Sequence, residues 1–158
     1  MHNALSKIAA RGGRASRQQG VAAVEFAVIM FVLFLIGAGV VEFGRAFWYY
    51  NAMLKGTRDA ARYLTAVPTM NLPSAGTTAR QIVVRAATSG GVPAFSSANV
   101  DISCAPVLCS AAVMPSDIRS VTVRTQYDLG IGSVFPFIGG GGAATVTLSP
   151  QTTMPYLW

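Results

Sequence analysis

Histidine and cysteine are almost absent from this chain of 158 residues. The only histidine is His2, so a Ser-His or Cys-His pair has no histidine to use in the body of the chain. Structural zinc sites usually need four ligands, so we expect no metal site and no cofactor. The six acidic residues share no recognisable catalytic motif, and we therefore expect that the protein is not an enzyme. These acids are Glu25, Glu42, Asp59, Asp101, Asp117 and Asp128.

Charged residues are also scarce, at 11% of the chain, although the net charge is +6. Four basic residues and no acid precede Gly20, which leaves a net charge of only +2 for the rest. Positive residues ahead of an apolar run hold that end of the chain in the cytoplasm. We therefore interpret residues 1–20 as a basic leader, and we expect no nucleic-acid binding because no dense basic patch follows. The four leader residues are Lys7, Arg11, Arg14 and Arg17.

The longest apolar run covers residues 21–41 and contains one charge, Glu25. About 21 helical residues extend roughly 31 Å, which matches the hydrocarbon core of a bilayer. The run therefore predicts a transmembrane helix. If Glu25 marks one edge, residues 26–41 are short for a straight span, and flanking residues, local thinning or neighbouring helices have to compensate.

The helix is expected to continue beyond the membrane, over residues 42–67, and to stop at Pro68 because proline breaks the hydrogen-bond ladder. Glu42 lies three residues before Arg45, which suits an ordinary helical ion pair worth about 0.2–0.5 kcal/mol. The aromatic run of residues 47–50 suits either an interfacial belt or the core of the next domain. Three-to-four spacing predicts one apolar stripe, formed by Phe43, Phe47, Tyr50, Leu54, Ala61 and Leu64.

Residues 68–158 are rich in Gly, Ala, Ser, Thr, Val and Pro, which suits a small extracytoplasmic α+β domain. We expect a loop over residues 69–76, a short helix over 77–88, and an antiparallel sheet of three or four strands packed on the long helix. Alternation places Val121, Val123, Thr125 and Tyr127 on one face of a strand. The predicted strands cover residues 99–104, 118–129 and 143–150. The four glycines of residues 139–142 lack a following Lys-Ser/Thr, so they favour a hairpin connection over a phosphate loop.

Four residues separate Cys104 from Cys109. In an exported domain such a pair more often forms one local disulfide than two buried thiols. Gly37, Gly39 and Gly44 lie in or beside the apolar run. They suit either close approach of another helix or glycine that a membrane helix merely tolerates.

Glu25 needs an explanation because a carboxylate in a membrane segment is costly. If the chain is cut after Gly20, Val21 becomes a free α-amine and Glu25 follows four residues later on the same helical face. The carboxylate then pairs either with the amine of its own subunit or with that of a neighbour, where it would set the axial register. The alternative is an edge residue without a role, whose side chain reaches to the headgroups.

At these residues the chain resembles a type IV prepilin, with a basic leader, Gly20, and Glu25 as the fifth mature residue. The string AAVEFA…VEFGRAF…N…RDAARY, from Ala22 to Tyr63, closely resembles TadE-like pseudopilins of the tight-adherence (Flp, type IVb) pilus system. The closing string ATVTLSPQTTMPYLW is similar to the last strand of that family, but more loosely. One departure is Phe26, where major pilins of this system carry tyrosine after the glutamate.

The resemblance implies a pilin-like fold and a minor pilin that acts in pilus assembly. A prepilin peptidase would cut between Gly20 and Val21 on the cytoplasmic side of the bacterial inner membrane. The assembly platform in that membrane, other pilins and other pseudopilins would be the partners. The C-terminal domain would then be periplasmic, and the subunit could enter an extracellular pilus.

Two rival hypotheses stay open from the sequence. A secreted protein with a conventional signal peptide could be cleaved at Gly37-Ala38-Gly39, although Glu25 and the long leader argue against this. An unprocessed single-pass membrane scaffold or sensor is the second rival. Basic residues do not decide the orientation, because residues 1–20 and residues 42–62 each contain four.

Overall fold

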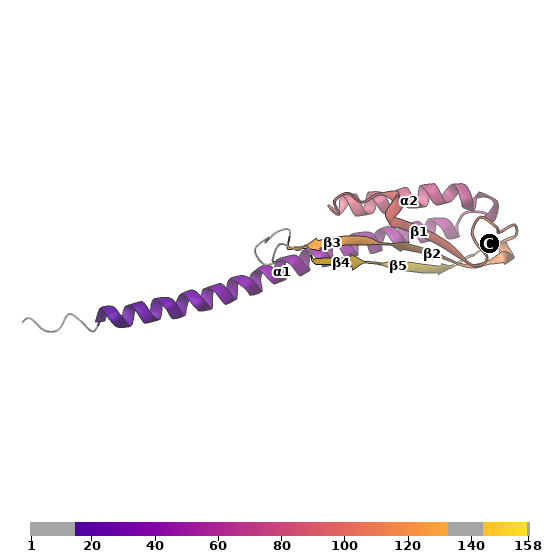
Figure 1. The fold of residues 1–158 in the computed structure, drawn as a ribbon. Helices are drawn as coiled ribbons and strands as arrows, with labels where there is room; N and C mark the ends of the chain where they lie inside the picture. Colours follow the sequence, from indigo (N-terminus) through magenta and orange to yellow (C-terminus); the bar gives the residue numbers. More distant parts are fainter. Residues whose placement is uncertain (1–14, 133–143, 158) are drawn as a thin grey trace, which may run out of the picture. The chain divides into compact units, whose positions relative to one another are not determined.

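A computed structural model of the chain describes residues 15–132 and 144–157. The chain divides into two units between Val41 and Glu42. One long helix, α1 (Ala15–Thr65), provides the first unit and the opening element of the second (Figure 1). It is long and apolar enough to cross a membrane. A small antiparallel β-structure follows it, which confirms the predicted α+β class.

The ends of α1 agree with the sequence at one side only. The helix ends at Thr65, three residues before Pro68 and two residues short of the predicted end at residue 67. It begins at Ala15, however, so the last residues of the basic leader are already helical. Gly12 and Gly13 disfavour helix only at their own positions. The residues from Ala15 to Gln19 include no proline, and only Ser16 is a weak helix former, so nothing stops the helix from starting there.

The second helix is longer than predicted. A turn of 3₁₀ helix covers Thr69–Asn71, and α2 runs over Leu72–Ser89, so the expected loop at residues 72–76 is wrong. Pro73 lies in the first turn of α2, where a missing backbone N–H costs nothing. Leu72, Ala75 and Ala79 are buried and extend the apolar face of the helix back into the Pro/Ser/Gly segment.

The described residues contain five strands in two sheets, whereas the sequence predicts one sheet of three or four strands. A three-stranded sheet has the order β1-β2-β5, and a two-stranded sheet pairs β3 with β4. The predicted strand at residues 118–129 is split at Gln126, and the last strand was missed because Pro150 precedes it. The bounds are β1 Val100–Pro106, β2 Ile118–Thr125, β3 Tyr127–Ile131, β4 Ala144–Leu148 and β5 Gln151–Pro155.

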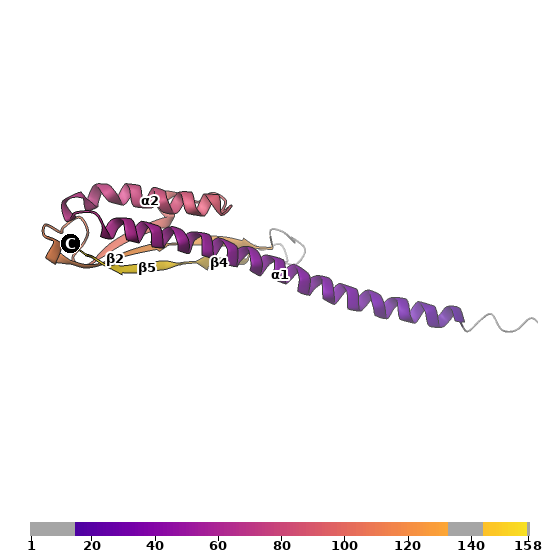
Figure 2. The ribbon, with the colours of Figure 1, turned by 180° about the vertical axis from the view of Figure 1, so that it is seen from behind.

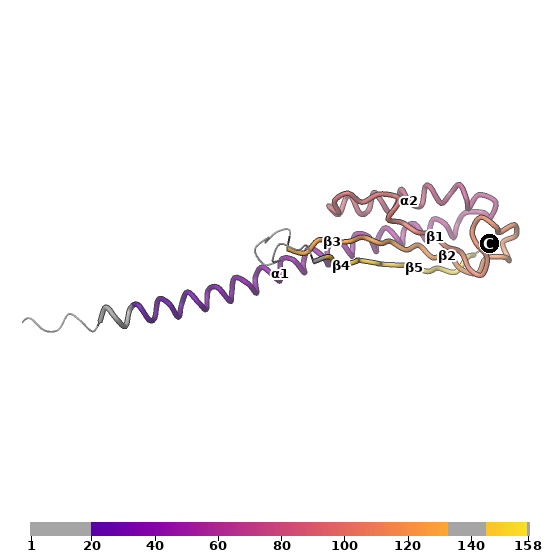
Figure 3. The backbone as a smooth tube through the Cα atoms, viewed as in Figure 1, coloured from indigo at the N-terminus to yellow at the C-terminus, as the bar shows by residue number. Residues whose placement is uncertain are grey.

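The pairs β2–β5 and β3–β4 form two successive parts of one antiparallel hairpin, and β1 adds to it alongside β2. Arg124 pairs with Gln151 in the first ladder and Tyr127 pairs with Leu148 in the second, so the register does not change between them. Pro150 has no N–H to donate, which interrupts the ladder at this point. Figure 3 shows β2 and β3 following one another along one path and β4 and β5 along the other. The predicted glycine connection at residues 139–142 lies outside the described residues.

Residues 42–65 of α1 cover one face of this β-structure, and α2 lies beside them (Figures 1 and 2). The predicted alternation in β2 is confirmed, because Val121, Val123 and Thr125 are fully buried. Thr57 of α1 shares a hydrogen bond of 3.0 Å with Thr152 of β5. Apolar packing therefore joins α1 to the three-stranded sheet, and this hydrogen bond between hydroxyls adds to it.

The predicted apolar stripe of α1 is partly wrong. Ala61 and Leu64 are buried, but Phe43 and Phe47 are 77% and 69% exposed. The inward face carries smaller residues instead, among them Ala46, Met53, Thr57 and Ala60. Side-chain size explains which residues of α1 face inward, because bulky aromatic rings would hold α1 away from α2 and the sheet.

Two glycines mark the closest approach of the helices. A Cβ atom added to Gly56 of α1 would lie 2.9 Å from the Cβ of Ala86 and 3.0 Å from the Cα of Val83 in α2. A Cβ atom added to Gly90, just after α2, would lie 2.4 Å from the Cβ of Ala52. The helix backbones therefore pack against each other with no room for a methyl group.

We predict that Gly56→Ala destabilises the domain. The added methyl group meets backbone atoms of α2, and overpacking of this kind costs about 1–3 kcal/mol, which exceeds the helix-propensity gain of about 1 kcal/mol. Gly76→Ala is the matched control, because Gly76 also lies in a helix and a Cβ there meets nothing within 4 Å. Chemical unfolding of the full chain in detergent micelles, followed by circular dichroism, should show a lower midpoint for Gly56→Ala only. Equal midpoints for the two variants would contradict the close packing.

Candidate functional site: the N-terminal segment of α1 and the Glu42–Arg45 pair

The residues predicted for processing and assembly lie on the surface of α1. Gly20, Val21, Val24 and Glu25 are exposed and line a shallow depression on the helix. Val21 and Glu25 are four residues apart within the helix, so their side chains lie on the same face, one turn apart. A Cβ atom at Gly20 would meet nothing within 4 Å. The segment is thus open to a protein that binds it.

Among the side chains that the structure describes, residues 20–132 and 145–157, none forms an ion pair with Glu25. Val21 is in mid-helix in this uncut chain, so its nitrogen is an amide that carries no charge. The structure therefore places Val21 and Glu25 one turn apart on the same face of α1. The positive charge that would balance the carboxylate would exist only after cleavage before Val21.

A second charged pair occurs where the apolar run ends. Arg45 donates from Nη2 to Oε2 of Glu42 at 2.7 Å, which agrees with the predicted spacing of three residues. The two side chains are only 22% and 10% exposed, for Arg45 and Glu42 respectively. The pair is therefore the helical ion pair that the spacing predicts, but it is largely shielded from solvent.

Both members of the pair also bind the end of β3. Arg45 donates from Nη2 to the carbonyl oxygen of Gly130 at 2.9 Å. The backbone N–H of Gly132 donates to Oε1 of Glu42 at 3.2 Å. These contacts join residues 85 and 90 positions apart, and no spacing rule in the sequence could have revealed them. The pair fixes the end of the β3–β4 hairpin to α1.

Aromatic side chains pack next to the pair. The guanidinium carbon of Arg45 lies 6.0 Å from the ring centroid of Tyr49, at the outer limit of a cation–π contact. Tyr127 of β3 donates its hydroxyl proton to the carbonyl oxygen of Pro93. Burial, with a smaller contribution from Tyr49, raises the pKa of Tyr127, while Arg45 acts in the opposite direction. Tyr127 is therefore neutral at physiological pH and is a hydrogen-bond donor.

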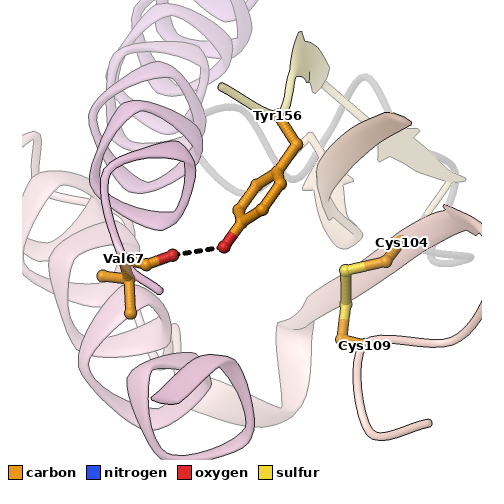
Figure 4. The surroundings of a disulfide bond; sticks show 4 residues. All are labelled: Val67, Cys104, Cys109 and Tyr156. Carbon is orange, nitrogen blue, oxygen red and sulfur yellow. Dashed lines mark hydrogen bonds between the residues drawn. A yellow bond between two sulfur atoms is a disulfide. The ribbon is translucent and has the colours of Figure 1, made fainter. Parts of the chain in front are cut away.

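The two cysteines lie at the other end of the domain, where the structure joins Cys104 and Cys109 in a disulfide (Figure 4). In the same region the hydroxyl of Tyr156 donates to the carbonyl oxygen of Val67, and burial raises the pKa of this tyrosine. The backbone N–H groups of Met114 and Val113 donate to Asp117, and these bonds lower the pKa of its carboxyl group. Tyr156, just after β5, is thereby tied to the segment that follows α1, while the disulfide and Asp117 hold the loop after β1 locally.

The structure has no group of three or more His, Cys, Asp or Glu side chains that could hold a metal ion, within the residues that it describes. The fold thus defines a class of protein in which an apolar N-terminal helix, long enough to span a membrane, precedes a small α+β domain. Residues 20–62 match the model of the TadE-like protein family, so this segment is similar to that family.

This match confirms the resemblance seen in the sequence between Ala22 and Tyr63. It begins at Gly20 and includes Glu25, Glu42 and Arg45. The α2 helix and all five strands lie outside it. No curated protein and no solved structure matches the chain significantly.

We predict that Glu42 stabilises the domain only together with Arg45. Glu42→Leu leaves a half-buried guanidinium without its carboxylate, and the Nε atom of Arg45 already has no hydrogen-bond partner. We expect a loss of roughly 1–3 kcal/mol in the free energy of unfolding. The double variant Glu42→Leu/Arg45→Met should recover most of it, because an apolar pair can replace a buried ion pair at little cost. Hydrogen exchange provides the local measurement, since the Gly132 amide should exchange faster in both variants. A double variant less stable than Glu42→Leu would show that the two residues act independently.

Proposed function

We propose that this protein is a pseudopilin, a minor pilin that acts in assembly of a tight-adherence (type IVb) pilus. The observation that carries the proposal is the match to the TadE-like family, which begins at Gly20 and has Glu25 five residues later in an otherwise uncharged apolar segment. The family indicates a role in such pilus systems, and the residues at its start suggest how that role is carried out.

In this proposal a prepilin peptidase hydrolyses the bond between Gly20 and Val21. Water adds across the peptide bond, so that Gly20 leaves with a carboxylate and Val21 becomes an ammonium group. The new helix terminus at Val21 also has unpaired backbone N–H groups and a positive dipole end. Glu25 lies in the first turns of this shortened helix, where an anion is stabilised.

The Val21 ammonium then neutralises a carboxylate that would otherwise be costly in lipid. If it pairs with Glu25 of a neighbouring subunit, the pair sets the axial register between two helices. If it pairs within the subunit, it lowers the cost of the charge in the membrane. The exposed position of both residues on α1 suits either arrangement.

The proposed location is the bacterial inner membrane, with the leader in the cytoplasm and residues 42–158 in the periplasm. The basic residues are equal in number on the two sides, but residues 1–20 contain no acid whereas residues 42–62 contain Glu42 and Asp59, which favours this orientation. The Cys104–Cys109 disulfide also favours it, because disulfides persist in the periplasm and are rare in the cytoplasm. The prepilin peptidase, the assembly platform and other pilins are the proposed partners, and the role is structural.

The N-terminal sequence of the protein isolated from membranes tests the processing step. We expect the sequence VAAVEF, starting at Val21, because the cut follows Gly20. A start at Val40 would instead indicate a conventional signal peptide, and an intact Met1 would indicate an unprocessed anchor. Either of these two results would contradict the proposed processing.

Glu25 is tested separately by substitution. Glu25→Ala should leave the amount of protein in the membrane unchanged but reduce assembled pili, because the Val21 amine loses its partner. Glu25→Gln keeps the shape and hydrogen-bonding atoms without the charge, and it should show the same defect. Pili counted by electron microscopy and subunit levels in membrane fractions provide the two measurements. Normal piliation in both variants would remove the role given to this carboxylate.

A further inference from the structure

The apolar run between Glu25 and Glu42 is shorter than the hydrocarbon core of a bilayer. With Glu25 at one edge, only residues 26–41 remain before the next charge, at Glu42. Sixteen helical residues extend about 24 Å, whereas the hydrocarbon core is about 30 Å thick. The deficit of about 6 Å corresponds to four more residues, so a straight helix would place residues 42–45 in the hydrocarbon edge.

The charges in that four-residue stretch do not face outward. Glu42 and Arg45 are its only charged residues, and both bind the end of β3 through Gly132 and Gly130. The next charge along the chain is Lys55. Glu42 and Arg45 are therefore the only charged residues between Phe26 and Leu54 in the sequence, and neither faces outward.

Aromatic side chains occupy this outward face just beyond the pair. Phe43 and Phe47 are largely exposed, and Trp48 is 66% exposed. The indole of Trp48 is also held in place, because its Nε1 donates to the carbonyl oxygen of Gly90 at 2.9 Å. Tyr49, in contrast, packs against the core. Exposed aromatic rings with a polar tip are enriched at the membrane–water interface.

We infer that a lipid surface covers this outward face, defined as Phe43, Phe47 and Trp48. The membrane boundary then lies at Phe47 and Trp48 rather than at Val41, and the end of the β3–β4 hairpin at Gly130–Gly132 rests at the level of the headgroups. The face follows the apolar run in the sequence, and the inward position of Glu42 and Arg45 removes the charges that would have kept it out of lipid. This inference does not depend on cleavage after Gly20 and stands or falls apart from the proposed function.

Fluorescence of Trp48 in the full chain tests the inference. Trp158→Phe leaves Trp48 as the single tryptophan, because the chain contains two. This variant is reconstituted into phosphatidylcholine/phosphatidylglycerol vesicles with bromine on the lipid chains, either near the headgroup or near the chain end. The emission should lose most of its intensity with bromine near the headgroup and less with deep bromine.

The matched control moves the tryptophan along the same helix. Trp48→Phe/Trp158→Phe/Tyr63→Trp places the indole 15 residues farther on, about 22 Å beyond position 48, at a residue that is 36% exposed. Neither brominated lipid should change its emission. Equal emission of the two variants in both lipids would overturn the inference, and so would stronger quenching by deep bromine.

Acrylamide, a water-soluble quencher, separates lipid from a second copy of the chain as the occupant. Trp48 should be shielded from acrylamide in vesicles and quenched by brominated lipid at the same time. Shielding from acrylamide without quenching by bromine would show that protein covers the face, and this result would also overturn the inference.

Discussion

The domain depends on the close contact of α1 with α2 and the sheet. A Cβ atom added to Gly56 would lie 3.0 Å from the Cα of Val83 in α2, so the two helices approach about as closely as their backbones allow. The buried residues around it are small or flexible, such as Ala60, Ala79 and Met53. Dispersion contacts are then made mainly by backbone and short side chains, and little conformational entropy is lost in ordering them. Small residues at the contact between α1 and α2 can hold the two helices close together in this way.

This packing explains which parts of the fold the sequence predicts well. The long helix, its end before Pro68 and the alternation in β2 follow from patterns a few residues long. The inward face of α1 does not follow, because the usual rule places aromatic residues inside, whereas here alanine, glycine and threonine are inside and Phe43 and Phe47 are outside. Hydrophobicity alone therefore does not predict which side chains of α1 point inward, because the close approach of the backbones favours small residues there.

The candidate site is likewise predicted from the sequence only in part. Gly20, Val21 and Glu25 are recognised from spacing, since all three lie within two turns of one helix. The Glu42–Arg45 pair is visible in the sequence as well, but its contacts with Gly130 and Gly132 are not, because they form only when distant segments meet. The missed strand β5 has the same cause: Pro150 suggests an end, while the ladder resumes in register just after it. Sequence spacing therefore identifies the candidate residues, but their partners become visible only in the folded structure.

The long separations in this network also determine the order in which the chain can fold. Arg45 binds a residue 85 positions later, Val67 binds one 89 positions later, and Thr57 binds one 95 positions later. Synthesis proceeds from the N-terminus, so α1 can enter the membrane long before its sheet partners exist. Until Thr152 and Tyr156 have been made, the inward face of residues 42–65 has no strand β5 to cover it. This half-formed domain is therefore the stage most exposed to proteases and aggregation, and closure of the sheet on α1 is the step that ends it.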